Sequence, residues 1–85
     1  MSFHKVFAVK DVKAGAFLPP FHFPTEGVAI RALTDCVKDP SHRFGANPED
    51  YDLYRLGEFD DEHGTYDLHD APVHVVSCHT LIPTE

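Results

Sequence analysis

Basic and aromatic side chains are interleaved along the first half of this 85-residue chain. Proteins that hold single-stranded nucleic acid combine cations that contact phosphates with aromatic rings on which bases stack. The basic residues expected to contact phosphates are Lys10, Lys13, Arg31, Lys38 and Arg43. The aromatic residues expected to be exposed and to stack on bases are Phe17 and Tyr54. The alternative, favoured by composition for most of the phenylalanines, is that they form the core of a small protein.

The charge of the chain is distributed unevenly. The formal net charge of -7 argues by itself against nucleic-acid binding, which usually requires a basic surplus. Residues 1–43, however, carry a net charge of +2, and residues 44–85 carry a net charge of -9. If the fold keeps these halves on different faces, one face can meet phosphate while the other repels it.

Metal binding and catalysis are weakly supported by the remaining reactive residues. Three histidines and a cysteine lie in one C-terminal stretch, His69, His74, Cys78 and His79. A zinc site needs four ligands at matched positions, and no Cys-x-x-Cys or His-x-x-x-His pair completes one here. No catalytic constellation can be singled out, because many of the carboxylates lie on evident turns. We therefore expect no metal, no cofactor and no enzymatic activity, and interpret these histidines as surface residues.

The clearest element that would position these residues is a helix over residues 25–38. Thr25 can cap its first turn, and apolar residues that include Cys36 recur at helical spacing. Arg31 and Asp35, four residues apart on the opposite side, can form an ion pair. Asp39-Pro40 ends the helix because the residue before a proline avoids helical geometry.

Two strong strands are predicted over residues 4–10 and 51–60. The first carries apolar residues on both faces, so it is either covered on both sides or lies in an interface. Alternation in the second places Tyr51, Leu53, Arg55 and Phe59 on one face. The other face would carry Asp52, Tyr54, Leu56 and Glu58.

The other segments are shorter. Residues 16–23 are expected to form a sheet edge or an arm, because Pro19-Pro20 cannot donate to a ladder. Residues 41–50 are predicted as a loop, 61–64 as a turn and 65–68 as a short hairpin partner of the second strand. For residues 72–82 both a strand and a short helix remain open.

These elements predict an α+β fold, a small mostly antiparallel β-sheet packed against one α-helix (about residues 25–38). We expect a single domain over residues 1–85, in which the element type of the C-terminal segment 69–85 stays open. A chain this short favours a homodimer, which buries more apolar surface. No apolar run is long enough to cross a bilayer and no secretory signal is visible, so we expect no membrane association and a cytoplasmic location.

The string DVKAGAFLPPF, residues 11–21, resembles the N-terminal motif of the small nonstructural protein of gokushoviruses, single-stranded-DNA bacteriophages of the microvirus group. Further blocks follow in the same order, and the resemblance covers residues 6–64. These blocks are GVAIR at 27–31, DPSH at 39–42, NPEDYDL at 47–53 and LGEFD at 56–60. Residues 65–85 depart from the family pattern.

The resemblance implies a nonstructural protein of the host cytoplasm that binds DNA, preferably single-stranded, during the switch to single-stranded genome synthesis. It carries no catalytic residues. Lys13 and Arg31 match it as phosphate contacts, and Pro19, Pro20 and Gly57 as residues that shape the backbone. The alternative is a protein–protein interaction module or DNA mimic, whose acidic half engages a basic phage or host replication protein. A third interpretation, a small metal-dependent enzyme, would need metal at the C-terminal histidines.

Overall fold

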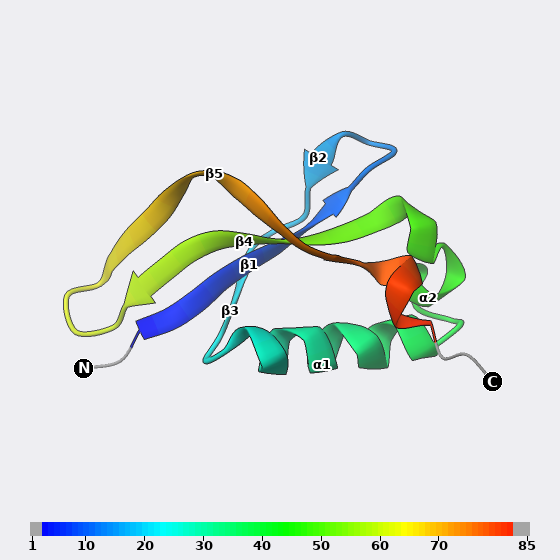
Figure 1. The fold of residues 1–85 in the computed structure, drawn as a ribbon, viewed down its shortest axis with the longest axis horizontal. Helices are drawn as coiled ribbons and strands as arrows, with labels where there is room; N and C mark the ends of the chain where they lie inside the picture. Colours follow the sequence, from blue (N-terminus) through cyan, green and yellow to red (C-terminus); the bar gives the residue numbers. More distant parts are fainter. Residues whose placement is uncertain (1–2, 83–85) are drawn as a thin grey trace.

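A five-stranded antiparallel sheet and one main helix make up the fold in the computed structural model, which describes residues 3–82. The strands run in the order β2-β1-β4-β5, and β3 pairs with β1 beyond β2. Figure 1 shows α1 on one side of the sheet and the hairpin of β1 and β2 rising on the other. The predicted α+β fold class is confirmed. The elements are β1 (Phe3–Asp11), β2 (Ala16–Phe17), β3 (Phe21–Phe23), α1 (Glu26–Lys38), α2 (Arg43–Ala46), β4 (Tyr51–Asp60) and β5 (Thr65–Ser77).

Helix α1 has the predicted bounds and supplies one side of the core. The Thr25 hydroxyl accepts a hydrogen bond from the backbone N–H of Val28 at 3.2 Å, which satisfies one of the free donors at the helix start. Its buried residues, Ala29, Leu33 and Val37, follow helical spacing and join the hydrophobic core. The expected pairing of Arg31 with Asp35 is absent from the ion pairs of residues 3–82.

Strand β1 lies inside the sheet and is buried on both of its faces. Phe7 and Val9 pack in the core with α1. Val6 and Ala8 point to the opposite face, yet they expose only 2% and 1% of their surface. Of the two expectations for this strand, cover on both sides is the one observed, and a single chain provides it. The burial of β1 therefore requires no second copy.

The short strands β2 and β3 form the sheet edge beside β1, as the prolines predicted. Both pair with β1 in antiparallel register, and Pro19-Pro20 lies in the gap between them. The backbone N–H of Leu18 still bonds to the carbonyl of Val9 at 2.8 Å. Two prolines in succession thus interrupt an otherwise continuous edge strand, because neither offers a backbone donor.

A β-bulge in β4 overturns part of the predicted face assignment. Arg55 lies opposite Phe7 but Gly57 lies opposite Val6, so Leu56 is an extra residue on β4. A bulge of this kind shifts the alternation of every later side chain. Phe59 therefore shares the face of Tyr54 and Glu58 that of Arg55, and the predicted placement of both is wrong. Gly57 has a φ of 154°, a conformation that glycine tolerates.

Strand β5 is longer than predicted. Residues 65–68 pair with β4 as the expected hairpin partner, but the strand continues to Ser77. Residues 69–72 bulge out opposite the single residue Leu56, which places Pro72 where the ladder needs no donor. Residues 73–77 then pair again, and a 3-10 turn follows at Cys78–Leu81. The segment 72–82 thus contains a strand and a helical turn. Residues 1–2 and 83–85 of the predicted domain lie outside the described residues.

The predicted loop 41–50 is also more regular than expected. It contains α2, whose first turn is capped by a hydrogen bond from the Phe44 N–H to His42 Nδ1 at 3.1 Å. A 3-10 turn at Pro48–Asp50 then leads into β4. Histidine is an unusual cap, so the local signal that normally marks a helix start was missing from the sequence.

Candidate nucleic-acid interface

Three aromatic rings form a row across the sheet face that α1 leaves uncovered. The rings of Phe17 on β2 and Tyr54 on β4 meet edge to face, with centroids 5.3 Å apart. Tyr54 meets His74 on β5 in the same way, with centroids 5.4 Å apart. We call Phe17, Tyr54 and His74 the aromatic row. The two rings predicted to be exposed are therefore neighbours. Phe17 is exposed, at 42% of its surface, but Tyr54 is half-buried, so the prediction of an exposed Tyr54 is wrong.

The row is continuous because the β1 residue that lies between Phe17 and Tyr54 has a small side chain. Ala8 on β1 lies directly opposite Tyr54 and contributes only a methyl group. Phe17 lies opposite Lys10, one step further along the same face, and reaches Tyr54 diagonally across β1. Tyr54 and His74 are directly opposed on β4 and β5, and side chains in that arrangement lie close enough for their rings to make contact. Sequence reasoning missed His74, because its pairing with Tyr54 depends on the register beyond the bulge in β5.

One of the predicted phosphate contacts, Lys10, lies beside the aromatic row, and a second, Lys13, lies in the turn that follows β1. The Lys10 amine lies 5.8 Å from the centre of the Phe17 ring, within the range of a cation–π interaction. Lys13 occupies the turn between β1 and β2 and exposes 80% of its side chain. Its amine is 3.6 Å from the Asp50 carboxylate, and exposed pairs of this kind contribute little stability. The Lys13 amine can therefore leave this weak pair for another anion, and the Lys10 amine lies at the edge of the row.

The other three basic residues lie elsewhere. Arg31 and Lys38 are exposed on α1, and Arg43 is exposed on α2. Figure 1 shows α1 on the side of the sheet opposite to the β1–β2 hairpin. Arg43 lines an apolar cleft of about 350 Å³ between the helices and the β2–β3 edge, together with Leu18, Phe21 and Cys36. The five predicted phosphate contacts thus do not form one patch.

The basic and acidic halves of the sequence are not on separate faces. They meet in the sheet, because β4 lies beside β1. Lys5 pairs with Glu58 at 2.5 Å, and Arg55 lies 3.8 Å from Glu26. Acidic residues also lie in the turn between β4 and β5, which contains Asp61 and Glu62.

The C-terminal histidines and cysteine are spread over different surroundings. Cys78 is buried in the core, whereas His69, His74 and His79 are exposed. Burial, with a smaller effect from the Asp52 carboxylate, raises the pKa of the Cys78 thiol to about 11. No three potential metal ligands gather anywhere within residues 3–82. In the same range, no helix is long and apolar enough to span a membrane.

Comparison with known proteins assigns the family. Residues 4–81 match the family described as phage ORF5 protein. No curated protein and no solved structure matches the chain. The family match covers nearly the whole chain, including residues 65–81. The chain is therefore a member of the phage ORF5 protein family.

Proposed function

We propose that this phage protein is a nonstructural DNA-binding protein that holds single-stranded DNA on the helix-free face of its sheet. The observation that carries the proposal is the aromatic row with the Lys10 amine beside the Phe17 ring. Aromatic rings on a sheet surface, flanked by cations, are the usual platform for unpaired bases. The bases of a duplex are already stacked, so this arrangement favours single strands.

The role of each residue follows from its position. Phe17 and Tyr54 offer ring surface to bases, and Lys10 and Lys13 neutralise phosphates on the β1–β2 side of the row. His74, at 3.7 Å from the Asp52 carboxylate, closes the row on the β5 side. This narrow interface fits a protein of net charge -7, because two local cations suffice for a weak, salt-sensitive complex. In the phage, such binding would serve the switch to single-stranded genome synthesis.

Binding of an oligothymidylate across a salt series tests the proposal. Phe17→Leu is expected to weaken binding by about fivefold or more, since stacking on one ring contributes about 1–3 kcal/mol. Lys10→Gln and Lys13→Gln are each expected to flatten the log-log salt slope by about 0.7, because one phosphate contact is lost. Duplex DNA is expected to bind more weakly than the single strand.

Arg31→Gln is the matched control for the lysine variants. It removes the same unit of charge from α1, on the other side of the sheet, and is expected to leave the salt slope unchanged. A salt slope that is flatter in Arg31→Gln than in the parent protein would extend the interface to α1. Full oligothymidylate affinity in folded Phe17→Leu protein, checked by circular dichroism, would rule out the aromatic row as the binding surface.

A further inference from the structure

A second group of aromatic side chains encloses a pocket at the far end of β1. The pocket has a volume of about 270 Å³ and is lined by one residue from each of four strands, His4, His22, Phe59 and Tyr66. The Phe59 and Tyr66 ring centres are 4.9 Å apart, and His22 lies 5.6 Å from Phe59. We call these four residues the aromatic pocket. It exists only because the bulge at Gly57 turns Phe59 onto this face.

Hydrogen bonds hold the walls of the aromatic pocket in place. His22 Nε2 and the Tyr66 hydroxyl share a hydrogen bond of 2.9 Å between β3 and β5. On the other side, the Asp61 carboxylate accepts a hydrogen bond from His4 Nε2 at 2.9 Å. This second bond places a carboxylate directly at the rim of the pocket. Walls that are fixed before a ligand arrives lose little conformational freedom when it binds.

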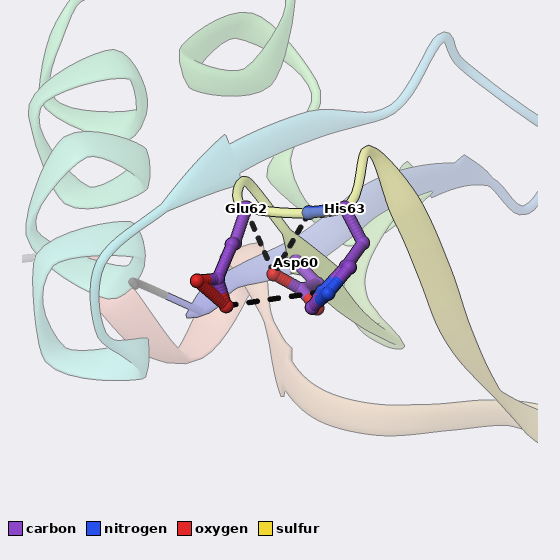
Figure 2. A network of polar contacts seen from close by, with 3 residues as sticks. All are labelled: Asp60, Glu62 and His63. Atoms are coloured by element: carbon purple, nitrogen blue, oxygen red, sulfur yellow. Dashed lines mark hydrogen bonds and ion pairs between the residues drawn. The ribbon is translucent and has the colours of Figure 1, made fainter.

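The turn that follows Phe59 carries further negative charge, but Asp60 alternates with Phe59 and so lies on the other face of the sheet. Figure 2 shows Asp60, Glu62 and His63 linked in this turn. Asp60 accepts hydrogen bonds from the Glu62 N–H at 2.9 Å and from His63 Nδ1 at 2.8 Å. These bonds, that of His63 above all, lower the pKa of the Asp60 carboxyl and keep it ionised.

The nearby cations lie on the other face of the sheet. Lys5 is paired with Glu58, and Arg55 lies within ion-pair distance of Glu26 at the start of α1. The pocket side of this end of the molecule therefore presents aromatic ring surface with the Asp61 carboxylate at its rim. That combination repels phosphate and attracts a cation.

We propose that the aromatic pocket binds an arginine side chain from a basic segment of a partner protein. A guanidinium is planar, stacks on aromatic faces and pairs with carboxylates, and the pocket offers both ring faces and a carboxylate. Lysine offers only a compact point charge and fits the flat walls less well. The pocket lies beyond the aromatic row, so this protein contact does not depend on the proposed DNA contact.

Titration with two matched peptides tests this pocket. The first is a short, capped Gly-Ser peptide containing two arginines, and the second replaces each arginine by citrulline, which keeps the planar group but loses the charge. The arginine peptide is expected to shift the NMR signals of His22 and Tyr66 and to bind more tightly than the citrulline peptide. Its affinity should fall as salt is added, because the Asp61 carboxylate contributes.

Two variants locate the binding. Tyr66→Leu removes an exposed ring, and Asp61→Asn removes a rim charge while keeping a group that can hydrogen-bond to His4. Each is expected to weaken arginine-peptide binding by about two- to fivefold, the effect of an exposed cation–π contact or ion pair. Phe17→Leu, in the aromatic row, is the control and should leave peptide affinity unchanged.

Several outcomes would overturn the proposal. They are no binding of the arginine peptide at millimolar concentration, equal binding of the citrulline peptide, or unchanged affinity in both folded pocket variants. Displacement of the peptide by oligothymidylate from the Phe17→Leu protein would assign the pocket to nucleobases instead. Because the peptide titrations contain no DNA, they stand whether or not the aromatic row binds a single strand.

Discussion

The two cysteines of this protein occupy very different environments. Cys78 is 0% exposed in the core, whereas Cys36 is half-buried and lines the apolar cleft. The thiolate is the reactive form, and burial holds the pKa of Cys78 at about 11. In the native protein we expect Cys36 to react with a disulfide reagent and Cys78 to react only after unfolding. Rapid reaction of one thiol per chain in the native Cys36→Ser protein would contradict this.

The raised Cys78 pKa also makes stability depend on alkaline pH. A thiol whose folded pKa lies above its ordinary value of 9.0 stabilises the fold in its neutral form. That contribution is complete below pH 9.0 and is lost as the pH rises toward about 11. The melting temperature is therefore expected to fall across this interval, and to fall less in Cys78→Ala. An equal fall in both proteins would assign the loss to other groups.

Single residues of the candidate site could be predicted where an aromatic side chain was expected to be exposed. Phe17 was correctly predicted to be exposed, whereas Tyr54 is half-buried against the rings of Phe17 and His74. The aromatic pocket could not be predicted from the sequence. Its four residues come from four strands, and Phe59 had been assigned to the other face. Only the register of a bulged sheet, which depends on long-range packing, brings them together.

The β4 bulge determines which side chains of this strand lie on each face of the sheet. A Cβ at Gly57 would lie 2.3 Å from the Asp67 carbonyl oxygen, and its φ of 154° is unfavourable for other residues. Gly57→Ala is expected to destabilise the protein by about 1–3 kcal/mol in urea unfolding. It should also disturb the aromatic pocket, since the bulge places Phe59 there.

Gly27→Ala is the matched control for that substitution. Gly27 lies in the first turn of α1, where an added Cβ meets only Thr25 Oγ1 at an ordinary 3.9 Å. Alanine favours the helix, so this variant should be neutral or more stable by up to about 1 kcal/mol. If both substitutions cost the same, the close approach of β5 to Gly57 is not what restricts that position.

Elements with local signals were predicted well, and those set by tertiary contacts were not. Helix α1 has its capping threonine and its terminating proline in the sequence, so its bounds were correct. The course of β5 depends on how residues 69–72 bulge out opposite Leu56, and no local sequence pattern predicts this bulge. The helix α2 was missed for a related reason, because a histidine caps it.

For the whole molecule, the homodimer stays a prediction. The strand that first suggested it is buried within a single chain, so the remaining argument is the small core together with exposed apolar side chains. Among these are Val12, Val28, Leu68 and Val73. Light scattering at high micromolar concentration is expected to give twice the monomer mass of 9.5 kDa. A constant monomer mass across a hundredfold dilution series would exclude it.

Both edges of the sheet are broken by proline. Pro19-Pro20 separates β2 from β3 on one side, and Pro72 lies in the bulge of β5 on the other. Each edge therefore offers only short rows of free backbone donors and acceptors, too short to template another sheet. Proline on an edge strand is one of the means by which proteins avoid edge-to-edge pairing of sheets. The same prolines that interrupt the two edge strands thus limit the pairing of this sheet with the sheet of another copy.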